Sequence, residues 1–120
     1  MKISSWNVNS VRARIENIKK YLQTNSPDLV LFQEIKTEEK NFPFDEIKRL
    51  GYESYVNRKK SYNGVSILSK KKLNEINTDL PGDKIKQSRF ISTEINIKNK
   101  SRIFFNNWNA NIFSYSRINC

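Results

Sequence analysis

Residues 29–32 form an uninterrupted apolar segment, which leaves few options for the fold. It follows an amphipathic segment and an earlier strand-like segment at residues 2–6. Because every position of 29–32 is apolar, we expect a strand that is buried on both faces, as in a parallel sheet. The intervening apolar residues recur at spacings of four, three and four, which predicts a helix over 11–22. They are Val11, Ile15, Ile18 and Leu22. The pattern therefore predicts a β-α-β unit with parallel strands.

The remainder of the sequence predicts one α/β domain over residues 1–105. Ser10 is the expected N-cap of the first helix. Further elements are expected as a short helix over 44–50 and strands over 52–56, 65–68, 91–97 and 102–105. Residues 106–120 include five Asn and follow neither a strand nor a helix period, so we expect an unstructured tail there.

The composition excludes several classes of protein. The 120 residues contain no His and a single Cys, Cys120, which excludes a histidine base, an internal disulfide and a Cys-rich zinc site within them. No apolar run approaches the ~20 residues of a membrane helix, and the first residues do not resemble a secretory signal. We therefore expect a cytoplasmic protein with no membrane association.

The charge balance points toward a polyanionic partner. There are 22 Lys and Arg against 12 Asp and Glu, which gives a formal net charge of +10. Clustered cations gain affinity for nucleic acids by releasing condensed counterions. An alternative interpretation is compositional, since AT-rich coding DNA also enriches Lys, Asn and Ile. Charge alone leaves both interpretations open.

Two polar residues follow the first two predicted strands. Asn7 follows the segment 2–6, and Glu34 comes soon after 29–32. Ligands of parallel α/β sheets bind outside the carboxyl ends of the strands, so the Asn7 amide and the Glu34 carboxylate would converge if these strands are neighbours. Such oxygen ligands suit Mg²⁺. The alternative is that Asn7 caps a turn and Glu34 is a solvated strand end.

Other polar residues indicate a phosphate-binding or DNA-binding site only when they are considered together. Asn9, Arg12 and Arg14 lie near the predicted helix N-terminus, where cations and backbone N–H groups favour phosphate. Lys36 could face the same place. Tyr62 could contact a DNA backbone, and Arg89 could bind phosphate or pair with a carboxylate. For each of them, an ordinary solvated surface position is the alternative.

The order of these residues is similar to that of a known family. Its motifs here are Ser5-Trp6-Asn7-Val8-Asn9-Ser10-Val11-Arg12-Ala13-Arg14, Pro27-Asp28, Gln33-Glu34-Ile35-Lys36, Tyr62-Asn63-Gly64-Val65 and Arg89-Phe90-Ile91. Residues 1 to about 103 resemble the N-terminal part of the exodeoxyribonuclease III family. These are AP endonucleases of the endonuclease/exonuclease/phosphatase superfamily. Ile35 stands where the family's Gln-Glu-Thr-Lys motif usually has Thr.

The resemblance implies a fold and a set of roles. The fold would be part of a four-layer α/β/β/α sandwich, namely its first sheet with the flanking helices. Glu34 and Asn7 would be the catalytic and metal-binding residues, with Mg²⁺ as the cofactor and Mn²⁺ as its substitute. DNA would be contacted by Asn9, Arg12, Ala13, Lys36, Tyr62 and Arg89. The implied activities are metal-dependent phosphodiester hydrolysis at abasic sites and at 3′ ends of double-stranded DNA, in the cytoplasm or on the nucleoid.

The sequence departs from the family after residue 105. The family's Tyr-x-Pro-Asn-Gly motif, its later catalytic Asp and Asn, and its Ser-Asp-His motif do not occur in these residues. From this we expect a truncated chain that is inactive alone and marginally stable, with an inner sheet face that is exposed unless the tail or a partner covers it. Three alternatives stay open: a non-catalytic DNA-binding fragment, a decayed frameshifted product, and assembly with a separately encoded C-terminal half.

Overall fold

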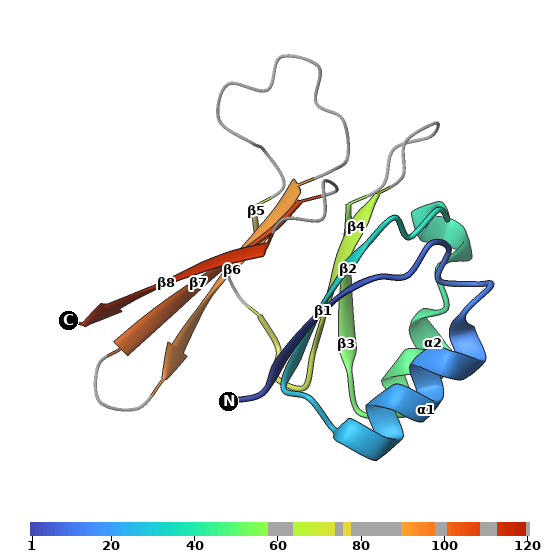
Figure 1. Ribbon diagram of the computed structural model, residues 1–120, viewed down its shortest axis with the longest axis horizontal. Coiled ribbons are helices and arrows are strands. Elements are labelled where there is room, and N and C mark those ends of the chain that lie inside the picture. Colours follow the sequence, from blue (N-terminus) through green and yellow to red (C-terminus); the bar gives the residue numbers. More distant parts are fainter. Residues whose placement is uncertain (58–63, 74–75, 78–89, 98–100, 109–112, 120) are drawn as a thin grey trace, which may run out of the picture.

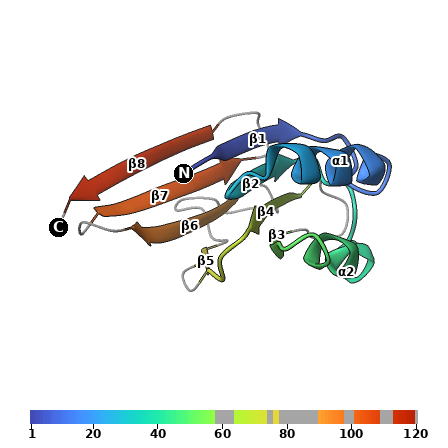
Figure 2. The same ribbon diagram turned by 90° about the horizontal axis from the view of Figure 1, so that it is seen from below.

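A computed structural model describes residues 1–57, 64–73, 76–77, 90–97, 101–108 and 113–119. Within these residues the backbone forms two four-stranded sheets and a small set of helices. The helices cover one side of the first sheet, and the second sheet lies on the other side (Figures 1 and 2). The predicted α/β fold is confirmed. In the described part of the chain, no helix has the length and apolarity needed to cross a membrane.

The first sheet contains the predicted parallel pair. Its strand order is β1-β2-β4-β3. The strands are β1 (Ile3–Asn7), β2 (Leu29–Gln33), β3 (Glu53–Asn57) and β4 (Val65–Ser69). β1 and β2 run parallel, with Asn7 opposite Gln33, whereas β4 is antiparallel to both β2 and β3. All of β2 is buried, as its continuous apolar sequence predicts.

The helices pack on one face of this sheet. They are α1 (Ile15–Asn25), the single 3-10 turn η1 (Glu39–Asn41) and α2 (Phe44–Lys48). Ile18 and Leu22 of α1 join a buried cluster with Val30 and Phe32 of β2. This is the face that the predicted amphipathic stripe provides.

The first helix begins later than the sequence predicts. α1 starts at Ile15 with Arg14 in the N-cap position, so a helix over 11–22 capped by Ser10 is wrong at its start. The backbone N–H groups of Ser10 and Val11 donate to carbonyls that follow β2. Those bonds hold residues 11–14 in a turn, in which Ser10 Oγ accepts a hydrogen bond from the Ala13 N–H at 3.2 Å.

A second sheet accompanies the first sheet and helices that the sequence predicts, and two of its strands enter the segment 106–120, where we expect an unstructured tail. Its order is β5-β6-β7-β8, all antiparallel. The strands are β5 (Ile76–Asn77), β6 (Phe90–Ile97), β7 (Ser101–Trp108) and β8 (Phe113–Asn119). β7 and β8 extend into the segment 106–120 because each pairs with the preceding strand, with Trp108 opposite Phe90 and Asn119 opposite Ser101.

The inner face of the first sheet is therefore covered. A second buried cluster contains side chains of β2, β4 and β6 together with Leu73. Its members are Leu29, Leu31, Val65, Ile67, Leu73 and Ile91. Alternate residues of β2 thus point to the helices and to the second sheet. In the described part of the chain, the second sheet provides the cover without which we expect this face to be exposed.

Candidate functional site

The loops that follow β1 and β2 lie side by side because the strands are parallel and in register. Backbone hydrogen bonds join the two loops from Val8 N to Gln33 O at 3.1 Å, Ser10 N to Glu34 O at 2.9 Å and Val11 N to Ile35 O at 2.9 Å. Ile35 N also donates to Gly64 O at 3.3 Å, which ties this loop to the start of β4. The backbone at this edge of the sheet is thus fixed on both sides.

Four residues of these loops have a left-handed backbone. The φ angles are 45° at Asn9, 87° at Ser10, 52° at Glu34 and 50° at Lys36. Asn adopts this region readily, whereas Ser, Glu and Lys do so rarely and at a cost of about 1–3 kcal/mol each. Ile35, between Glu34 and Lys36, is fully buried in the core. Core packing therefore holds the loop in this conformation.

The strand ends bring four predicted residues into one polar cluster. Asn7 Nδ2 donates a hydrogen bond to Glu34 Oε2, and Asn7 Oδ1 accepts one from the Asn9 N–H at 3.2 Å. Lys36 Nζ donates to Asn9 Oδ1 at 2.6 Å and lies 3.9 Å from Glu34 Oε1. The Glu34 side chain is 27% exposed and that of Lys36 43%, so solvent and ligands can reach the cluster.

A polar pocket adjoins the cluster. Its lining residues are Ser10, Arg12, Ala13, Lys36, Thr37, Glu38 and Asn41. Three of these, Arg12, Ala13 and Lys36, are predicted DNA contacts that the structure brings together. Lys40 forms an ion pair with Glu38 at 3.4 Å, which offsets the one carboxylate of the lining. The pocket thus has the chemistry of a phosphate-binding surface.

Sequence reasoning missed three residues that line this pocket, and not every residue that it named lines the pocket. Thr37, Glu38 and Asn41 were not singled out, although their closeness to Lys36 in the sequence was a usable signal. Tyr62 and Arg89 lie outside the described residues. Arg14 is exposed next to the first turn of α1 and does not line the pocket.

The donor set of the cluster fits a hard divalent cation. The Glu34 carboxylate and the amide oxygens of Asn7 and Asn9 gather within one network of hydrogen bonds. Within the described ranges there is no group of three or more His, Cys, Asp or Glu that could hold a metal. Mg²⁺ commonly binds through one or two carboxylates and keeps several waters, so a single Glu with an Asn is sufficient for it.

Comparison with known families gives a match over most of the chain. The profile of the Endonuclease/Exonuclease/phosphatase family matches residues 4–115. Exodeoxyribonuclease III of Haemophilus influenzae is 32% identical over 83 residues, which cover 69% of this chain and 31% of that protein. The chain therefore spans about a third of the length of this curated relative.

Solved structures of similar fold include nucleases and a phosphatase. The 3′ phosphatase NExo from Neisseria, bound to a product DNA hairpin, has a TM-score of 0.73 and 32% identity, covering 85% of this chain and 39% of that one. An AP endonuclease from Archaeoglobus fulgidus has a TM-score of 0.72 and 32% identity, covering 79% of this chain and 37% of that one. Both contain more than twice the matched length.

Proposed function

The chain belongs to the endonuclease/exonuclease/phosphatase family, and on that basis we propose that it forms the metal-binding and phosphate-binding part of a DNA phosphodiesterase site. The observation that carries this proposal is the pairing of Asn7 with Glu34 at the carboxyl ends of two parallel strands. Ligands of α/β sheets bind at this edge. The names of the relatives are those of an exodeoxyribonuclease, a 3′ phosphatase and an AP endonuclease, and we propose abasic sites and 3′ ends of DNA as the substrate class here.

The proposed roles follow from position and chemistry. Glu34 and Asn7 supply oxygen ligands for Mg²⁺ or Mn²⁺. The cation, when bound, polarises a phosphoryl oxygen and stabilises the charge that develops on it. Lys36 faces both Asn9 and Glu34, so its ammonium group would hold a phosphate oxygen beside the carboxylate.

Contacts to the DNA backbone would lie in the adjoining pocket. The Arg12 guanidinium is exposed there and can make two parallel hydrogen bonds to a phosphate, while the short side chain of Ala13 lets the backbone approach closely. The family resemblance adds Tyr62 and Arg89 to this proposed set of contacts.

Water activation is the step that these residues do not supply. The sequence has no His, and the carboxylate of the cluster is assigned to the cation. We therefore propose that this chain alone binds DNA and cation but hydrolyses the phosphodiester bond several orders of magnitude more slowly than a site with a general base. A C-terminal half, corresponding to the part of the relatives that these residues do not span, would provide the base.

A non-catalytic DNA-binding role is the second candidate. The observation that favours it is the net charge of +10, which promotes binding to any polyanion. Such binding would depend on salt and would need neither the cation nor Glu34. That difference separates the two candidates experimentally.

The experiment is a comparison of the purified chain with Glu34→Gln and a matched control, Glu53→Gln, whose carboxylate lies on β3 and is 48% exposed. Each protein is mixed with duplex DNA that contains one abasic site, with Mg²⁺ or with EDTA, and both binding and incision are measured. We expect Mg²⁺ to strengthen binding of the parent chain and of Glu53→Gln but not of Glu34→Gln.

The outcomes discriminate among the proposals. Incision that disappears only in Glu34→Gln would show that the chain has a complete active site, which contradicts the proposed need for a second half. Binding that is equal in all three proteins and insensitive to Mg²⁺ would exclude the proposed metal site and support the non-catalytic role.

A further inference from the structure

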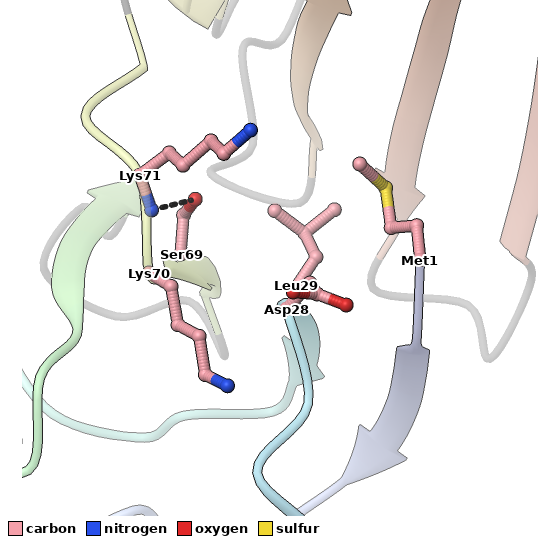
Figure 3. Close-up of a pocket in the computed structure, with 6 residues that line it drawn as sticks. All are labelled: Met1, Asp28, Leu29, Ser69, Lys70 and Lys71. Atoms are coloured by element: carbon pink, nitrogen blue, oxygen red, sulfur yellow. Dashed lines mark hydrogen bonds between the residues drawn. The ribbon is translucent and has the colours of Figure 1, made fainter. Parts of the chain in front are cut away.

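A second pocket lies at the other end of the first sheet. Met1, Asp28, Leu29, Ser69, Lys70 and Lys71 line it, and its volume is about 340 Å³ (Figure 3). In the antiparallel register of β2 and β4, Leu29 pairs with Ser69, whereas Gln33, at the Glu34 end, pairs with Val65. The length of β2 therefore places this pocket about 17 Å from the proposed nuclease site.

The floor of the pocket is apolar. Leu29 is fully buried and belongs to the core between the two sheets, whereas Met1 is 58% exposed and stands at the opposite wall. An exposed Met beside a buried Leu offers an adaptable apolar surface to the body of a ligand. The volume is near the lower limit for small-molecule pockets, which suits one small molecule better than a macromolecule.

The rim of the pocket carries two lysines with different roles. Lys70 Nζ donates to the carbonyl oxygen and the hydroxyl of Ser26, at 2.9 Å and 2.6 Å, so its charge is used to fix the end of α1. Lys71 is held at its backbone, where its N–H donates to Ser69 Oγ at 3.2 Å. Within the described residues its ammonium group has no hydrogen bond or ion pair, and its side chain extends toward the side of the pocket where Leu29 lies (Figure 3).

Asp28 provides an acceptor on the same rim. Its Oδ2 accepts a hydrogen bond from the Lys2 N–H at 2.7 Å, which orients the carboxylate. An oxygen of Asp28 is directed toward the side of the pocket where Met1 stands (Figure 3). The pocket thus combines an unpaired cation, an oriented acceptor and an apolar floor.

We propose that this pocket binds a small organic anion of the nucleoside monophosphate class. Lys71 takes the phosphate, Met1 and Leu29 contact the base, and Asp28 accepts a hydrogen bond from an N–H of the base. A fatty acid would offer Asp28 no hydrogen-bond donor, and inorganic phosphate would make no use of the apolar floor. The proposal does not depend on the nuclease function, because binding is measured without metal and at the opposite end of the sheet.

The test uses the single Met of the chain as a local reporter. Protein labelled with ¹³C at the methionine methyl group gives one NMR signal from the pocket wall, and deoxyadenosine monophosphate is titrated in EDTA. We expect a saturable shift of this signal with a Kd of about 1 mM. Deoxyadenosine or inorganic phosphate alone should bind at least about tenfold more weakly, because each lacks one half of the contacts.

Variants assign the binding to Lys71. Lys71→Glu should weaken binding by about tenfold or more, whereas Lys71→Arg, which keeps the positive charge, should bind as the parent chain does. Both substitutions alter an exposed side chain and leave the backbone hydrogen bond to Ser69 intact. The control is Lys48→Glu, which makes the same charge change at an α2 side chain that is 70% exposed. No saturable shift, an equal affinity for inorganic phosphate, or an equal loss in Lys48→Glu would overturn the proposal.

Discussion

Asn7 donates a hydrogen bond to the Glu34 carboxylate, although 27 residues separate them in the sequence. The two meet because β1 and β2 are parallel and Asn7 stands opposite Gln33, the residue before Glu34. Three further backbone hydrogen bonds continue the pairing beyond the strands. The relationship is therefore set by the register of the sheet, and it places an amide and a carboxylate at the edge where α/β proteins bind ligands.

Lys36→Ala should weaken DNA binding and lower its salt dependence. The Lys36 ammonium group lies 3.9 Å from Glu34 Oε1, and removing one phosphate contact lowers the slope of log affinity against log salt by about 0.9. Fluorescence anisotropy of a labelled duplex at several salt concentrations measures this slope. Lys48→Ala, on α2, is the control, and an equal change in it would show that Lys36 contributes only net charge.

Tyr52→Phe should destabilise the fold at neutral pH by about 1 kcal/mol, because the buried Tyr52 hydroxyl donates to Pro27 O at 2.6 Å. Burial raises the pKa of Tyr52 above its usual value of about 10. At a pH between the unfolded-state and folded-state pKa values, the unfolded state has lost the Tyr52 proton and the folded state still holds it. The parent chain therefore loses stability as the pH rises above the unfolded-state pKa and through the folded-state pKa.

Urea unfolding of both proteins at pH 7 and at about pH 10.5 tests this linkage. The stability gap between the parent chain and Tyr52→Phe should narrow at the higher pH, because Phe does not titrate. A gap that is constant or wider there would contradict the account of Tyr52.

Ser26→Gly should be more stable than Ser26→Ala by about 1 kcal/mol. Ser26 ends α1 with φ 46° and ψ 52°, and its N–H donates to Leu22 O at 3.0 Å. A left-handed backbone is strained for any residue with a Cβ, whereas Gly adopts it freely. Both variants lose the hydroxyl that binds Lys70, so their difference isolates the backbone effect. Equal melting midpoints would argue against this conformation at the helix end.

Ile91→Ala should lower the free energy of unfolding by about 2–5 kcal/mol, because the Ile91 side chain of β6 is fully buried between the sheets. A double-mutant cycle with Ile67→Ala, in the same cluster, should give a coupling energy of about 0.5 kcal/mol or more. The cycle with Ile47→Ala, in the helix-side cluster, should be additive. An Ile91→Ala variant as stable as the parent would mean that the second sheet does not cover the first.

The sequence was sufficient to predict the β-α-β unit and the convergence of Asn7 with Glu34. Both follow from local signals, since a continuous apolar strand must be buried and parallel strands end at the same edge. The start of α1 was not predictable in the same way. Ser10 has the residue type of an N-cap, but bonds to a loop more than twenty residues away decide its conformation.

The second sheet and the shape of the site depend on non-local contacts. β8 contains Ser, Asn and Arg among its apolar residues, so its sequence has no regular strand period. It forms because it pairs with β7. Glu34 and Lys36 have left-handed backbones that their residue types disfavour, and the burial of Ile35 between them enforces this conformation. These features depend on contacts with neighbouring strands, so the local sequence does not predict them.

Divalent-cation binding by Glu34 and Asn7 is measured by a calorimetric titration of the purified chain with Mn²⁺ or Mg²⁺. We predict one binding site in the parent chain and in Glu53→Gln, and at least about a tenfold loss of affinity in Glu34→Gln with an unchanged unfolding midpoint in urea. Equal affinity in Glu34→Gln and the parent chain would contradict binding by these residues, since the cation would then bind elsewhere.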